Sequence, residues 1–417
     1  MTTKPQRSLL WLALIGLAGW VAGDALAGGP LCRALSGDEA TSRRAIEALR
    51  GQGPAAVETL LSSAPPEASP GRERWERTLD AVCAQRDCAA SGLYWYTDLD
   101  LARAEAQRTG KPILSLRLLG RLDEEVSCAN SRFFRTVLYP DPEVSGVLRD
   151  RFVLHWASVR PVPRLTIDFG DGRRLEGTIT GNSVHYVLDS RGRLVDALPG
   201  LYGPGLFLDR LQAAEEAAGE LSQVDDSDFG WARAEFHAGR LAAISAFLAS
   251  ETGADLDALP GPAVRGEPPT AREAARLAAS KSAIEIPLLT AVSLGVRSAQ
   301  LAEVDWAALA ARYRADWRLS EDSCRLLLKK HRAGDAAEGA RVVARFEELV
   351  GEDTMRNEYL LHSVFHSWMV SPTSWDTPLD QLDERVYAEL FLTPGSDPWL
   401  GLASPETYLA LEAAGGG

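Results

Sequence analysis

Several motifs that mark large enzyme classes are missing from these 417 residues. The chain has no Gly-x-Ser-x-Gly elbow, no phosphate-binding loop and no Gly-x-Gly-x-x-Gly dinucleotide fingerprint. Basic residues are also in short supply, because 44 Lys and Arg face 58 Asp and Glu, which leaves a formal net charge of −14. The sequence therefore argues against a serine hydrolase, against nucleotide-dependent chemistry, and against nucleic acid or an anionic membrane surface as a partner.

Long apolar runs are scarce as well. The longest, Leu9 to Gly23, follows Lys4 and Arg7 and precedes the small residues at 25–27. This pattern is typical of an export signal, so we expect residues 1–27 to be a signal peptide and the protein to be periplasmic or extracellular. An uncleaved anchor is the alternative, although the run is short for a membrane span. We expect no other contact with a membrane.

Cysteine is rare, and its number is odd. In an oxidising compartment an odd number leaves at least one thiol unpaired or joins two molecules. Cys83 and Cys88 lie at the end of a predicted helix, so a local disulfide between them is one interpretation, with Cys32 as the competing partner. No second pair follows at zinc-site spacing, which argues against a metal role for this pair. The five cysteines are Cys32, Cys83, Cys88, Cys128 and Cys324.

The spacing of apolar residues changes twice along the chain. Three- and four-residue spacing predicts helices at both ends, including a short helical hairpin over residues 38–61, whereas short β-rich runs alternate with helices in between. We therefore expect an α/β domain with a central sheet and flanking helices, placed between an N-terminal helical segment and an all-α C-terminal domain. The expected parts are the helical segment at 28–92, the α/β domain at 93–222, the helical domain at 223–412 and a disordered tail at 413–417.

Local signals in the sequence predict individual elements, most of them in the α/β region. The sequence Gly170-Asp171-Gly172-Arg173 predicts the turn of a β-hairpin, and Thr270 opens a capping box that predicts a helix in the C-terminal domain. The expected helices are 98–109, 130–138 and 205–221, and the expected strands are 113–118, 152–159, 166–169, 174–179, 185–188 and 194–197.

A lone cysteine, Cys128, lies where a predicted strand gives way to a predicted helix. Backbone N–H groups and the positive end of a helix lower a thiol pKa there and favour the nucleophilic thiolate. The acidic residues at 123–125 oppose that effect. Ser131 stands one helical turn further on, where a second cysteine would release a mixed disulfide rapidly. The pattern thus indicates either a single-cysteine redox site or a small buried side chain.

The order of several motifs around Cys128 resembles that of the thioredoxin-like superfamily, in particular its exported bacterial members. The matching positions are Ala102 and Ala106 on the first helix, Lys111-Pro112 before the strand, Cys128, Phe152-Val153 at the next strand, and the Gly181–Gly192 segment. The resemblance implies a thioredoxin-like fold and a protein substrate or partner.

The same comparison reveals departures from the family pattern. Ser131 replaces the resolving cysteine, Ser127 replaces the usual tryptophan, and Ser183 occupies the position of the family's cis-proline. The predicted hairpin over 166–179 stands where thioredoxin has a helix. The resemblance therefore implies at most a monothiol thiol-disulfide oxidoreductase or isomerase, with Cys128, Ser131 and Ser183 at its site. The alternative is a binding or scaffold protein that kept the fold and lost the chemistry.

Two further groups of residues are candidates for chemistry. His155 and His185, on predicted strands, are candidate bases for Cys128, although strand histidines commonly serve as hydrogen-bonded scaffold residues. Glu358, His362 and His366 follow one another at four-residue spacing on a predicted helix, which projects three zinc or copper ligands along one side. The competing interpretation places them at the margin of an apolar helix face. A metal site there needs a further ligand from another element, and we expect no other cofactor.

Overall fold

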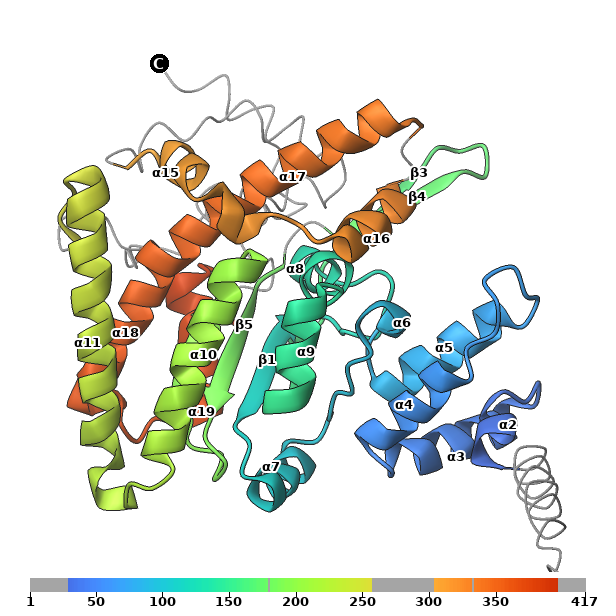
Figure 1. Ribbon diagram of the computed structural model, residues 1–417, viewed down its shortest axis with the longest axis horizontal. Helices are drawn as coiled ribbons and strands as arrows, with labels where there is room; N and C mark the ends of the chain where they lie inside the picture. The colour runs from blue at the N-terminus through green and yellow to red at the C-terminus, as the bar shows by residue number, and fades with distance from the viewer. Residues whose placement is uncertain (1–28, 179–180, 257–303, 332–333, 397–417) are drawn as a thin grey trace, which may run out of the picture. The chain divides into compact units, whose positions relative to one another are not determined.

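The computed structural model describes residues 29–178, 181–256, 304–331 and 334–396 (Figure 1). The predicted signal peptide, the helix predicted to open at Thr270 and the predicted tail lie outside these ranges. Within the described ranges, no helix has the length and apolar character that a membrane span requires. The described residues form two compact units, which divide between Tyr94 and Trp95.

The described part of the first unit is helical. Asp38 caps the helix Glu39–Arg50 by accepting a hydrogen bond from the Thr41 N–H at 2.8 Å. Pro54 begins the next helix, Pro54–Ser62. Proline suits this position because a backbone N–H in the first turn of a helix has no hydrogen-bond partner within the helix. Together the two helices form the helical hairpin that the sequence predicts. The elements are α2 (Pro30–Ala34), α3 (Glu39–Arg50), α4 (Pro54–Ser62), α5 (Arg72–Cys83) and α6 (Cys88–Ser91).

A disulfide joins Cys83 and Cys88 across the turn between α5 and α6. Asp80 stabilises this turn, because its carboxylate accepts from the Cys88 N–H at 2.9 Å and from the Arg86 guanidinium at 2.9 Å. Of the two pairings that the sequence left open, the structure contains the local one, and Cys32 lies exposed.

Four strands form the main sheet in the described part of the second unit, in the order β2-β1-β5-β6. The central strand β1 (Ile113–Leu119) pairs in parallel with β2 (Val153–Arg160), and β5 (Ser183–Leu188) runs antiparallel to β1. At the edge, β6 (Leu194–Pro199) runs antiparallel to β5. Nearly all of β1 is buried, including the polar Ser115, and only Arg117 is partly exposed.

Helices pack against this sheet with local signals at their ends. Asp98 caps α7 (Leu99–Thr109) by accepting from the Asp100 N–H at 2.8 Å, and Gly110 ends it with a φ of 74°. Figure 1 shows α9 (Pro142–Arg151) and α10 (Pro204–Leu221) side by side over the sheet, with α9 packed against β2 and α10 against β5 and β6.

The predicted hairpin is present as β3 (Arg164–Asp168) and β4 (Arg174–Thr178), a two-stranded sheet separate from the main one. Gly170 and Gly172 adopt φ angles of 76° and 91° at its turn, which is the conformation that favours glycine. Most of its residues are exposed, including the apolar Phe169.

The remaining described elements are helical and belong to the same unit as the sheet. The π-helical turn η4 packs against β6, and α11 packs against α18. The mixed α/β class with helical regions, as the sequence predicts, is confirmed. The elements are α8 (Ala129–Phe133), η1 (Phe134–Leu138), α11 (Asp226–Thr252), α15 (Trp306–Arg312), η3 (Arg314–Trp317), α16 (Glu321–His331), α17 (Ala336–Arg356), η4 (Asn357–His362), α18 (Ser363–Val370), η5 (Pro372–Ser374), α19 (Leu379–Arg385) and η6 (Val386–Leu390).

Candidate functional site

Cys128 is the N-cap of α8, the helix that follows β1. Its Sγ accepts a hydrogen bond from the Ser131 N–H at 3.4 Å, so the sulfur meets the helix N-terminus as the sequence predicts. The side chain of Cys128 is nevertheless fully buried, with 0% of its surface exposed. A disulfide substrate could not reach this sulfur unless the surrounding structure opened.

The structure brings together the three residues predicted for the thiol site. Asn130, in α8, donates to the Ser183 hydroxyl at 2.8 Å, which ties the start of β5 to the cysteine helix. The Ser131 hydroxyl lies 2.8 Å from the Ser127 hydroxyl. All of these side chains are buried. The cysteine corner, meaning Cys128, Ser131 and Ser183 with their neighbours, is therefore a hydrogen-bonded interior rather than an open groove.

A segment from the C-terminal helices reaches the same corner. The Tyr387 hydroxyl, in η6, donates to the Asn182 carbonyl at 3.0 Å, one residue before Ser183. Burial raises the pKa of Tyr387 well above its usual value, and the neighbouring Asp383 and Cys128 side chains raise it further. Arg160 stacks over the Tyr387 ring and donates to the Thr393 carbonyl. The C-terminal segment therefore helps to bury the cysteine corner.

Asp383 lies one helical turn before Tyr387 and carries a buried carboxyl group. Its Oδ1 accepts from the Tyr186 hydroxyl at 3.2 Å. Burial raises the pKa of Asp383 from 3.8 to about 7, with Asp380 and Glu384 adding to the rise and Arg117 and Tyr186 opposing it. The native state therefore holds this proton more tightly than the unfolded chain does.

We expect the ionisation of Asp383 to lower the free energy of unfolding as the pH rises from about 4 to about 7. The contribution of the bound proton is complete below the unfolded pKa of 3.8 and is lost as the pH rises through the folded pKa of about 7. The variant Asp383→Asn keeps a neutral side chain at every pH, so its unfolding free energy should show less of this decline. Urea unfolding at several pH values checks the difference, and parallel profiles for the two proteins would contradict it.

His155 and His185 are both buried scaffold residues of the sheet. His155 Nδ1 lies 2.8 Å from the Ser115 hydroxyl, and His185 Nε2 lies 2.8 Å from the Tyr139 hydroxyl. Burial lowers the pKa of each imidazole to about 3, with the Arg117 charge contributing at His155. Their hydrogen bonds and neutral state agree with the scaffold interpretation of these histidines.

A second group of chemical side chains lies in the helical region. Glu358 and His362 are in η4 and His366 is in α18, and all three are fully buried. His362 Nδ1 lies 2.9 Å from Glu358 Oε2, while the rings of His362 and His366 lie 3.9 Å apart between centroids. The four-residue spacing thus places the three side chains along one buried side of the helix.

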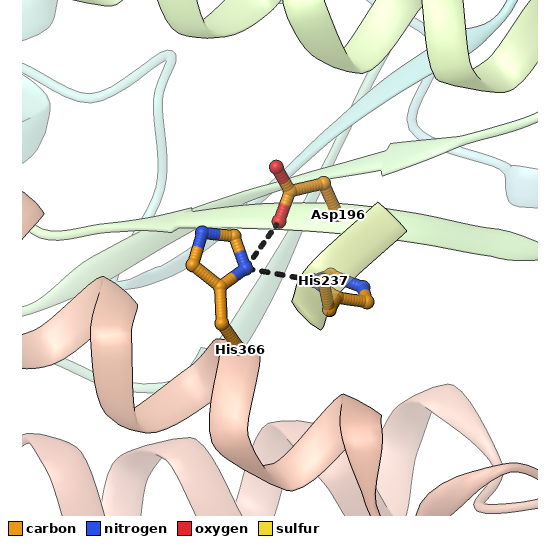
Figure 2. Close-up of side chains that lie close together, drawn as sticks. All are labelled: Asp196, His237 and His366. Carbon is orange, nitrogen blue, oxygen red and sulfur yellow. Dashed lines mark hydrogen bonds and ion pairs between the residues drawn. The ribbon is translucent and has the colours of Figure 1, made fainter. Parts of the chain in front are cut away.

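Two residues from distant parts of the sequence complete this group, as Figure 2 shows in part. Asp196, in β6, places its Oδ1 3.0 Å from His362 Nε2 and 3.8 Å from His366 Nδ1. His237, in α11, places its Nδ1 2.7 Å from His366 Nδ1. The ligand atoms of Asp196, His237 and His366 lie within 4.8 Å of one another, close enough to hold a single metal ion. We call the five residues the histidine-carboxylate cluster: Asp196, His237, Glu358, His362 and His366.

The negative charge of Glu358 is balanced by its own partners. Its Oε1 lies 2.9 Å from Arg210 Nε and 3.3 Å from Arg240 Nη2, and its Oε2 accepts from the Tyr202 hydroxyl at 3.4 Å. Burial works against the charged carboxylate, but His362 and the two arginines hold the pKa of Glu358 below its usual value. Glu358 is therefore an ionised residue that orients His362.

The histidines of the cluster differ in charge. Burial disfavours the charged form of His362, but the adjacent Asp196 and Glu358 carboxylates outweigh it and raise the pKa of His362 to about 9. Burial lowers the pKa of His237 to about 4, and it holds the pKa of His366 well below its usual value. The cluster can therefore hold one positive charge next to Asp196, either as a proton on His362 or as a bound cation.

Sequence reasoning did not single out Asp196 or His237. Asp196 is the one carboxylate within the apolar strand Leu194–Pro199, and an unexplained acidic residue in a buried strand was the available signal. His237 lies among polar and apolar residues of α11 without a distinctive spacing. Comparisons of the chain with protein-family models, with curated proteins and with solved structures give no match.

Proposed function

We propose that this chain is an exported protein with a thioredoxin-like fold, and that it serves as a binding or scaffold protein rather than as a thiol-disulfide oxidoreductase. The observation that carries the proposal is the complete burial of Cys128. Thiol-disulfide exchange needs direct attack of a thiolate on a disulfide, and reactive cysteines are at least partly exposed. Ser131 removes the internal route for releasing a mixed disulfide.

Support for the fold comes from where the matching motifs fall. Lys111-Pro112 immediately precedes β1, Cys128 caps the helix that follows, and Ser183 begins the strand antiparallel to β1. The hairpin β3–β4 stands where the family has a helix, and it exposes Phe169 and Leu175, by 51% and 38%. Its apolar side chains are the surface that we assign to a protein partner, because binding elements are often carried on loops of a rigid scaffold.

Thiol labelling tests this proposal. In the native protein we expect iodoacetamide to modify Cys128 at least about 100-fold more slowly than in the urea-unfolded chain, because the thiol reacts only when the site opens locally. Mass spectrometry of the digested protein identifies the labelled residue, and Cys128→Ser is the control. Native labelling of Cys128 at the unfolded rate, together with a disulfide reductase activity that Cys128→Ser abolishes, would overturn it.

One observation favours a monothiol redox role as the second candidate. The Sγ of Cys128 accepts from a helix N-terminal N–H, an arrangement that stabilises a thiolate. This role requires the segment around Tyr387 to move away. Under this alternative, Tyr387→Ala would accelerate both alkylation and the reduction of a small disulfide, whereas the scaffold proposal expects at most faster alkylation without turnover.

A further inference from the structure

The histidine-carboxylate cluster collects four potential metal ligands from three separate parts of the chain. Asp196 comes from the edge strand β6, His237 from α11, and His362 and His366 from the helix that runs through η4 and α18. Figure 2 shows the Asp196 carboxylate and the His237 ring converging on the same nitrogen of His366. The cluster therefore supplies the ligands from other elements that a single helix cannot provide.

Asp196, His237 and His366 already place their ligand atoms within 4.8 Å of one another, and His362 Nε2 lies next to the Asp196 carboxylate. Zinc bonds of 2.0 to 2.1 Å to nitrogen place neighbouring ligand atoms about 3.3 Å apart. Asp196 Oδ1 lies 3.0 Å from His362 Nε2 and 3.8 Å from His366 Nδ1, and the 2.7 Å between the His237 and His366 Nδ1 atoms must open when an ion binds.

The neighbours of the four donors resemble the outer shell of a metal site. Glu358 binds Nδ1 of His362, which directs Nε2 of the same ring towards Asp196. Carboxylates that bind the far nitrogen of a ligating histidine are a common way to orient it. Because Arg210 and Arg240 already balance Glu358, the charge of Asp196 is the one that a cation would neutralise.

The hydrogen bond between His237 and His366 leaves Nε2 of His366 without a partner. The two imidazoles share one hydrogen bond through their Nδ1 atoms, and the His237 ring also has a hydrogen bond with the Val195 backbone, whereas Nε2 of His366 is buried with no hydrogen-bond partner. If His237 donates, His366 carries a buried N–H at Nε2 without an acceptor, and if His366 donates, its Nε2 lone pair is buried without a donor. Two imidazoles facing each other through their Nδ1 atoms are instead a natural arrangement for two ligands of one ion.

We propose that Asp196, His237, His362 and His366 bind one Zn²⁺ ion in a closed structural site. Three imidazoles and one carboxylate suit zinc, and all four side chains are almost fully buried, which favours a structural role over a catalytic one. The ion would link β6, α11 and α18, three elements that no disulfide joins in the described part of the chain. This inference goes beyond the proposed function and does not involve Cys128.

Metal analysis of the full chain tests the site. We expect about one zinc per chain after purification without chelators, and a lower melting temperature after the metal is removed, because an ion that binds only the folded state stabilises it. Co²⁺ added to the metal-free protein should give the visible bands of four-coordinate cobalt. His237→Ala and His366→Ala should weaken binding by more than the about 10- to 100-fold typical of outer-shell changes.

Two further variants keep the test decisive. His155→Ala removes another buried, hydrogen-bonded histidine outside the cluster, so it should lower stability and leave the metal content unchanged. His237→Cys retains a donor atom for the metal. If the alanine variants do not fold, this variant should still bind Co²⁺ and add a sulfur-to-cobalt charge-transfer band.

Two results would overturn the proposed metal site. One is the absence of stoichiometric metal together with no uptake of Zn²⁺ or Co²⁺ at micromolar concentrations. The other is metal binding that survives His237→Ala combined with His366→Ala. Thiol labelling of Cys128 is a separate readout, so the two proposals fail independently.

Discussion

Replacing Glu358 by alanine should lower the free energy of unfolding by about 3 to 5 kcal/mol. The substitution leaves Arg210 and Arg240 without their common carboxylate and removes one of the two acceptors of the buried His362. Removing one partner of a buried ion pair costs far more than the pair itself contributes, because the remaining charge stays desolvated. Urea unfolding in the presence of a chelator measures this cost without a contribution from bound metal.

Glu348→Ala is the matched control for this prediction. Glu348 is also a glutamate near two arginines, with Arg345 at 3.2 Å and Arg314 at 4.0 Å, but half of its side chain is exposed. Water screens such pairs, so we expect a loss below about 1 kcal/mol. Equal effects of the two substitutions would show that Glu358 is not held in a buried network.

Replacing Gly181 by alanine should destabilise the cysteine corner strongly. A Cβ atom at this position would lie 2.4 Å from the Cβ of Cys128 and 3.1 Å from the Ala129 nitrogen, and neither atom belongs to a flexible side-chain end. One segment must move away from the other, and overpacking of this kind typically costs about 1 to 3 kcal/mol or more. Urea unfolding measures the loss. Combining Gly181→Ala with Cys128→Gly removes the opposing Cβ and should recover part of it.

The same substitution at Gly146 should stabilise the protein instead of destabilising it. Gly146 lies inside α9, and a Cβ built there meets nothing within 4 Å. Alanine favours the helix over glycine by about 0.5 to 1 kcal/mol, so this variant should be more stable than the parent. If Gly181→Ala left the free energy of unfolding as high as in the parent, the inferred clash with Cys128 would be contradicted.

The local elements of the α/β region were predictable because their signals are local. Asp98 and Gly110 mark the two ends of α7, and the glycines at 170 and 172 mark the hairpin turn. The position of Cys128 was also predictable, because the sequence places it where a strand gives way to a helix, and it is the N-cap of α8. These features depend on backbone preferences over a few residues.

The state of Cys128 depends on residues far away in the chain. Its helix position and the nearness of Ser183 are as the sequence predicts. Its complete burial involves Tyr387, which binds the Asn182 carbonyl from a helix more than two hundred residues later. No pattern around position 128 contains that information, since burial is a property of everything that packs on a site.

The histidine-carboxylate cluster divides in the same way between sequence and structure. The sequence by itself determined that Glu358, His362 and His366 share one side of a helix, because the helical repeat places every fourth residue on the same face. Only the tertiary structure decided that Asp196 and His237 join them, since β6 and α11 meet this helix through packing of apolar surfaces that is not specific to these polar residues. Helical spacing is set by hydrogen bonds four residues apart, whereas a ligand shell is set by contacts between elements that are more than a hundred residues apart in the sequence.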